Sequence, residues 1–206
     1  MKVLFILIFA IIFIVSPTSG QDIDIEHLQA VLNREGYRAG PIDGNLGRKT
    51  RDSLIAFQKA HGLPQKEGRI DEETVIALRN VRKLEAKESG KAIHLEIDLD
   101  RQLLYVVEGG EILNIIHAST GRNEKTPTGK FSIYQKVTTG WVTAIGRDGN
   151  PQGQMYKPLK FHGPFYIHGS GSVPSYPASL GCVRVNPRHM DFLHRITSVG
   201  TEVIVY

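Results

Sequence analysis

The spacing of hydrophobic residues changes once along this chain, between residues 80 and 93, and that change limits the folds open to it. In residues 25–32 apolar side chains recur every three or four positions, which predicts an amphipathic helix. In residues 93–99 they alternate with polar ones, which predicts a half-buried strand. The sequence therefore predicts an α+β protein in which a helical unit precedes a strand-rich one.

Three short helices are expected in the first unit, residues 22–80. The first stops at Gly36, and the second runs from about Arg48 to His61. Asp71 stands where a third helix needs its N-cap. We therefore expect a small three-helix bundle with a thin core.

The second unit, residues 92–206, is predicted to be mostly antiparallel β structure, arranged as a sandwich. A hairpin is expected to turn at Gly109 and Gly110, and residues 186–197 contain the one expected helix. Residues 81–91 are charged and lack a hydrophobic stripe, so they are interpreted as a linker.

The first 20 residues have the composition of a secretory signal peptide. Lys2 precedes an apolar run, Val3–Val15, and Pro17 ends it before small residues. The run is shorter than the roughly 20 residues of a membrane-spanning helix, although an uncleaved N-terminal anchor is the alternative. We expect an exported protein of the periplasm or cell wall, with no membrane span once the signal is removed.

Charge and cysteine content narrow the function. The formal net charge is +4 without long runs of like charge, so no nucleic-acid partner is expected. The chain has one cysteine, Cys182, which cannot form an internal disulfide. It is either an inert buried residue or a free reactive thiol.

The surroundings of Cys182 favour reactivity. On a strand, Cys182 and Arg184 would share one face. The guanidinium would favour the thiolate there, or hold a substrate carboxylate. Gly181 leaves the backbone open, so that nearby amides could approach an oxyanion.

A nucleophilic thiol also needs a base, and the chain has eight histidines. His168 ends an apolar run and meets a Gly-Ser-Gly loop, where catalytic groups are often presented; His162 is the second candidate. The others are assigned to the helical unit, to strands away from that loop, or to the surface of the last helix: His27 and His61, His94 and His117, and His189 and His194.

The segment "IHGSGSVPSYPASLGCVRV" resembles the signature of the L,D-transpeptidases of the YkuD type. The matching positions are His168, Gly169, Ser179, Gly181, Cys182 and Arg184. Upstream, Thr126 to Gly129 match a Thr-Pro-Thr-Gly segment, so the resemblance covers roughly residues 92–206. The chain departs at Leu180, where many members have a histidine, which puts substrate contacts or thiol activation in doubt.

The helical unit resembles a three-helix peptidoglycan-binding module. The resemblance rests on "GPIDGNLGRKTRDSLIAFQKAHGL" and the following "GRIDEETVIALRN". It implies peptidoglycan as the partner; the alternative is a helical spacer with no ligand.

The catalytic resemblance implies Cys182 as nucleophile, His168 as base and the Gly169 carbonyl as the group that orients the imidazole. Amides near Gly181 and Cys182, beside Ser179, would serve the oxyanion, with electrostatic support from Arg184. The implied reaction attacks the bond after the third residue of a peptidoglycan tetrapeptide, releases D-Ala, and forms a 3→3 cross-link in cell-wall biogenesis. It implies a monomer with no metal or organic cofactor.

Five alternatives stay open. With the same fold, water as acceptor gives an L,D-carboxypeptidase, and a lipoprotein lysine gives protein anchoring. An NlpC/P60-type endopeptidase would place its cysteine before its histidine. A zinc site would need His162, His168 and Cys182, which lack compact spacing. A non-catalytic wall-binding protein is the last.

Overall fold

The computed structural model describes residues 24–65, 68–146 and 149–206. The predicted signal peptide, residues 1–20, lies outside them. Within the described residues, no helix combines the length and apolar character needed to cross a membrane.

The helices of the first unit form where the spacing predicts them. They are α1 (Ile25–Arg34), α2 (Arg48–Ala60) and α3 (Glu72–Arg79). Asp24 caps α1 by accepting from the Glu26 amide. Asp71 caps α3 by accepting from the Thr74 amide at 2.9 Å, as the sequence predicted. Residues 81–93, which follow α3, form neither helix nor strand.

The second unit is a large sheet with one α-helix, α4 (Pro187–Ile196), and a 3₁₀ turn at Arg122–Glu124. Its strands are β1 (His94–Asp98), β2 (Leu103–Glu108), β3 (Glu111–Ser119), β4 (Gly129–Ser132), β5 (Gln135–Lys136), β6 (Trp141–Ile145), β7 (Pro151–His162), β8 (Phe165–Gly169), β9 (Val183–Val185) and β10 (Glu202–Val205). The β2–β3 hairpin turns at Gly109 and Gly110, as predicted.

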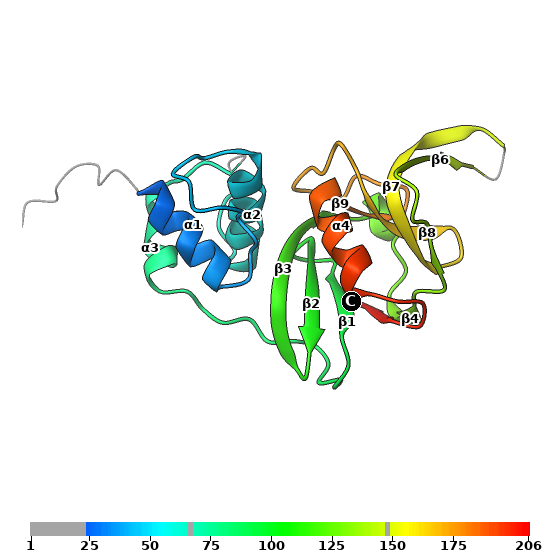
Figure 1. Cartoon of the computed structure of the whole chain (residues 1–206), viewed down its shortest axis with the longest axis horizontal. Coiled ribbons are helices and arrows are strands. Elements are labelled where there is room, and N and C mark those ends of the chain that lie inside the picture. Colours follow the sequence, from blue (N-terminus) through cyan, green and yellow to red (C-terminus); the bar gives the residue numbers. More distant parts are fainter. Residues whose placement is uncertain (1–23, 66–67, 147–148) are drawn as a thin grey trace, which may run out of the picture.

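The strands follow one hydrogen-bonded path, in the order β4-β10-β1-β2-β3-β9-β8-β7-β5, with β6 paired to β7. Pairing is antiparallel except between β1 and β10 and between β8 and β9. The prediction of mostly antiparallel strand pairing is confirmed. The predicted sandwich is not confirmed, because the path is continuous and curls around α4 (Figure 1).

The prediction that β1 is half-buried is wrong, because both of its faces are covered. Its polar residues are as buried as its apolar ones. Glu96 accepts hydrogen bonds from the main-chain amides of Lys87 and Glu88 and from the Tyr206 hydroxyl. The segment predicted as a linker therefore packs over this face and pairs with its buried carboxylate.

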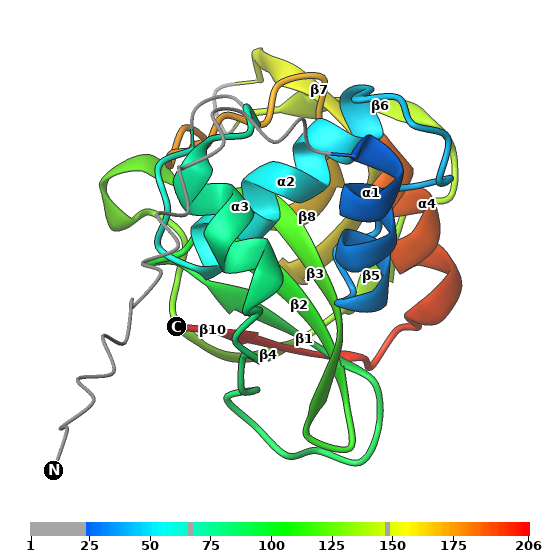
Figure 2. The same cartoon turned by 90° about the vertical axis from the view of Figure 1, so that its left-hand side faces the viewer.

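The two units share a hydrophobic core. One face of the sheet packs against α4 around Ile97, Ile167 and Met190. The outer face of β2 and β3 packs against Leu32 and Phe57 of the helices, and Figure 2, viewed from the helical side, shows α2 in front of these strands. The predicted three-helix bundle is not confirmed, because the sheet completes the core of the helical unit.

Candidate active site

Strands β8 and β9 bring the predicted catalytic residues together. The parallel register places His168 beside Arg184 and Ile167 beside Val183. Cys182, one residue before β9, is therefore next to Tyr166 and diagonal to His168. Because side chains two apart on a strand share a face, Cys182, Arg184 and His168 lie on the same face of the sheet.

The hydrogen bond of His168 fixes the tautomer of its imidazole. Nδ1 lies 3.0 Å from the Gly169 carbonyl oxygen. Since a carbonyl oxygen only accepts, Nδ1 carries the proton and Nε2 keeps its lone pair. His168 is 5% exposed, and burial lowers its pKa to about 4, against the effect of the Gly169 contact; the charge of Arg184 lowers it further. The imidazole is neutral at pH 7, and Nε2 is free to take a proton.

The Cys182 thiol is half-buried, and its sulfur lies 4.0 Å from the Pro164 carbonyl oxygen. Burial raises its pKa, and the Tyr166 main chain and the Arg184 charge only partly oppose this. The sequence suggested that Arg184 would favour the thiolate. The raised pKa instead keeps the Cys182 thiol neutral at pH 7, as the lowered pKa keeps the His168 imidazole neutral.

Ser179 and Gly181 build the turn that presents Cys182. The Ser179 hydroxyl donates to the Cys182 carbonyl oxygen at 2.6 Å and accepts from the Gly181 amide at 3.0 Å. Gly181 has φ +130°, and a Cβ there would lie 2.2 Å from the Phe165 ring, so only glycine fits. Because its amide is already donated, Gly181 offers no oxyanion donor in this conformation.

The Thr-Pro-Thr-Gly segment supports the same turn. The buried Thr126 hydroxyl donates to the Gly181 carbonyl oxygen at 2.9 Å and accepts from the Gly121 amide at 2.8 Å. The two segments that match the family signature, 55 residues apart, are thus joined directly.

The thiol opens into a crevice of about 900 Å³. The β6–β7 hairpin supplies one wall, including Met155, and Tyr166 supplies part of another. Leu180, half exposed, stands at the edge of the crevice beside Cys182. A side chain at position 180 can therefore contact whatever the crevice holds.

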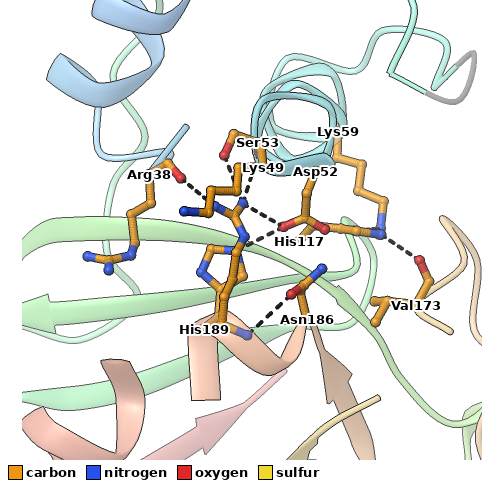
Figure 3. Close-up of polar contacts among 10 residues, drawn as sticks. Arg38, Lys49, Asp52, Ser53, Lys59, His117, Val173, Asn186 and His189 are labelled. Carbon is orange, nitrogen blue, oxygen red and sulfur yellow. Dashed lines mark hydrogen bonds and ion pairs between the residues drawn. The ribbon is translucent and has the colours of Figure 1, made fainter. Parts of the chain in front are cut away.

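A buried polar network lies between the helical unit and the sheet (Figure 3). Asp52 of α2 accepts from His189 Nε2 at 2.8 Å and from Arg188 at 3.1 Å, both on α4. Burial works to raise the pKa of Asp52, but the hydrogen bond and charge of His189 hold it below its usual value. His189, predicted at the surface, is 2% exposed.

A lysine of the helical unit completes this network. Lys59 Nζ donates to the carbonyl oxygens of Gln102 and Ala118 and to His117 Nδ1, at 2.9–3.1 Å. His117 Nε2 then donates to the Val173 carbonyl oxygen, in the loop between His168 and Cys182. The sequence placed His117 away from that loop. The contact arises because β3 passes beneath it, which periodicity alone does not reveal.

The second candidate base, His162, lies at the end of β7 and stacks near Phe131 and Phe165. Across the described residues, no three histidine, cysteine, aspartate or glutamate side chains converge as metal ligands would.

Comparisons with known proteins agree with this geometry. A sequence model of the YkuD L,D-transpeptidase catalytic domain matches residues 92–205, and one of a putative peptidoglycan-binding domain matches residues 21–78. An L,D-transpeptidase structure from Xylanimonas cellulosilytica is 34% identical, with a TM-score of 0.82 over 89% of this chain and 93% of that one. The chain belongs to the YkuD L,D-transpeptidase family.

A more distant L,D-transpeptidase structure, from Stackebrandtia nassauensis, shares the fold. It is 22% identical, with a TM-score of 0.52 over 88% of this chain and 89% of that one. A comparison with curated proteins gives no match. As a member of the YkuD family, the chain combines the catalytic domain with an N-terminal peptidoglycan-binding domain.

Proposed function

We propose that this protein is an exported cysteine acyltransferase that forms 3→3 cross-links in peptidoglycan. Family membership supplies the reaction class. The observation that carries the residue assignment is the hydrogen bond from His168 Nδ1 to the Gly169 carbonyl, because it leaves Nε2 as the proton acceptor on the face that carries Cys182.

In the first half-reaction, the Cys182 sulfur attacks the carbonyl carbon of the third stem residue while His168 Nε2 takes the thiol proton. The tetrahedral intermediate collapses, the C–N bond to D-Ala breaks, and the imidazolium returns the proton to the leaving amine. The low pKa of His168 makes its imidazolium a strong acid, which favours this return. The product is a thioester on Cys182.

In the second half-reaction, the nitrogen of the acceptor amine attacks the thioester carbonyl, and His168 Nε2 takes a proton from that amine. The C–S bond then breaks, and the thiolate recovers the proton. An amide forms between two stems, and the enzyme regains its starting state. Arg184, opposite His168 on β9, stabilises negative charge on sulfur in both steps.

The direct test incubates the purified protein with a disaccharide-tetrapeptide and identifies the products by mass. We expect a cross-linked dimer together with free D-Ala. Release of D-Ala with no dimer would assign the carboxypeptidase reaction in its place. Neither product, from protein with a normal melting transition, would contradict acyl transfer from this substrate.

A further inference from the structure

Two adjoining hollows lie at the boundary between the helical unit and the catalytic unit, away from the Cys182 crevice. They measure about 420 and 670 Å³, and both are lined by Lys49 and Arg188. Arg38 lines the smaller hollow, and Trp141 lines the larger one. Together they form what we call the interdomain cleft.

Uncompensated positive charge gathers at the Arg38 end of the cleft. The one carboxylate of the neighbouring network, Asp52, is already bound to Arg188 and His189. Within the described part of the chain, the side chains of Arg38 and Lys49 make no hydrogen bond or ion pair, and Arg38 Nε is buried without a partner.

An aromatic ring holds the Arg38 guanidinium in place. The guanidinium lies over the Phe192 ring, 3.6 Å from the ring centroid, and Phe192 belongs to α4. Burial, and then the like charges of Arg188 and Arg195, lower its pKa. Like charges collected in a hollow repel one another, so a bound anion would stabilise this arrangement.

The other end of the cleft suits a sugar. Trp141 is half exposed, and its ring centroid lies 5.3 Å from that of Tyr156. Ser170 and Asn186 of the catalytic unit and Asp43 of the helical unit add hydrogen-bonding groups. A flat aromatic face with polar neighbours matches the amphipathic faces of a saccharide ring.

We propose that the interdomain cleft binds a peptidoglycan strand, with a stem-peptide carboxylate held by Arg38 and Lys49 and a sugar placed against Trp141. The inference rests on the proposed function, which makes such strands the substrate. Both units then contribute to one site, and the motif segment 40–50 of the helical unit forms its wall. Ser170 and Gly171 also line it, so the strand would lie next to the loop that follows His168.

The test uses Trp141, the protein's single tryptophan, as a fluorescent reporter. A disaccharide-tetrapeptide is titrated into the Cys182→Ala protein, which cannot be acylated. The double variant Arg38→Gln/Lys49→Gln should weaken binding about tenfold or more, because it removes two charged hydrogen-bond donors. Arg51→Gln, which removes an exposed charge from the same helix, should leave the affinity unchanged.

Unchanged affinity in the double variant would overturn the proposal. Equal binding of a fragment whose carboxylates are amidated would also overturn it. Displacement of the fragment by inorganic phosphate at a similar concentration would overturn it too, since the site would then be one for phosphate. A thermal melt of the double variant accompanies the titration, because Arg38→Gln also removes the contact with the Phe192 ring. The single variant Lys49→Gln, which keeps that contact, should weaken binding as well.

The cross-linking assay separates this inference from the proposed function. If the wild-type protein forms no product yet the titrations behave as expected, the acyl-transfer proposal fails and the cleft stands. If dimers form while the double variant binds the fragment normally, the cleft fails and the acyl transfer stands.

Discussion

The interdomain network and the catalytic centre both contain buried histidines, but they differ in how fully their polar atoms are paired. Between the units, Asp52 has two partners on α4, and the Lys59 ammonium has three acceptors. At the catalytic centre, His168 uses only Nδ1, and Cys182 has a single long contact. Groups with several hydrogen-bond partners hold the two units together, whereas groups with few partners are available for reaction.

The largest effect is expected from a substitution that disables the catalytic centre and leaves the interdomain network intact. Cys182→Ala should lower transpeptidation by at least about 10⁴-fold, since the nucleophile is removed. The melting temperature should change little, because the half-buried thiol has only one weak contact. A steady-state assay with a parallel thermal melt checks both. Retained turnover would remove Cys182 as nucleophile, and a collapsed melt would mean that the centre is structural too.

Asp52→Ala should have the next largest effect, which is a loss in the free energy of unfolding. It leaves the partly buried Arg188 guanidinium without a carboxylate and leaves the buried His189 Nε2 without its acceptor. Losing one partner of a buried ion pair costs about 3–5 kcal/mol, which chemical denaturation would measure. Cys182 should keep its reaction with iodoacetamide in the folded fraction. A loss below about 1 kcal/mol would show that this pair behaves like a surface pair.

The sequence predicted the family and the local elements better than it predicted these contacts between the units. The helix positions, the β2–β3 hairpin and the Asp71 cap follow from local spacing and turn residues, and the signature residues lie close together in the chain. Asp52 and His189 are 137 residues apart, so no local window relates them. The burial of His117 and of the polar face of β1 likewise depends on segments that arrive from elsewhere in the chain.

Lys59→Met should cost less than the loss of Asp52. It leaves the Gln102 and Ala118 carbonyls and His117 Nδ1 without their donor, a loss of about 1–3 kcal/mol. Burial also lowers the pKa of Lys59 to about 7, with Asp52 partly opposing. In the unfolded chain the pKa of lysine is about 10.4. Between the two pKa values Lys59 carries a proton in the unfolded chain but not in the folded one, so wild-type stability should rise with pH across this range.

Denaturation of Lys59→Met and the wild-type protein at several values between pH 7 and 10 checks both expectations, with Arg51→Gln as the exposed control. The rise in stability with pH should be weaker in Lys59→Met and intact in the control. Equal slopes in all three proteins would show that Lys59 is not the group that titrates.

The two regions should also respond differently to pH. Burial lowers the pKa of His168 and of His117 to about 4. Histidines in the unfolded chain take up protons at about pH 6.5, so stability should fall as the pH drops from that value towards about 4. The value of kcat/KM should hold over the same range and fall tenfold per pH unit only below about 4. An acid limb near pH 6.5 would contradict a neutral, buried His168.

The most direct measurement of the central claim is the intact mass of the protein after brief mixing with a disaccharide-tetrapeptide. The account predicts an adduct equal to the donor fragment less D-Ala, located on Cys182 by peptide mapping and absent from Cys182→Ala. Cross-linked product formed with no adduct on Cys182, or an adduct that persists in Cys182→Ala, would contradict it.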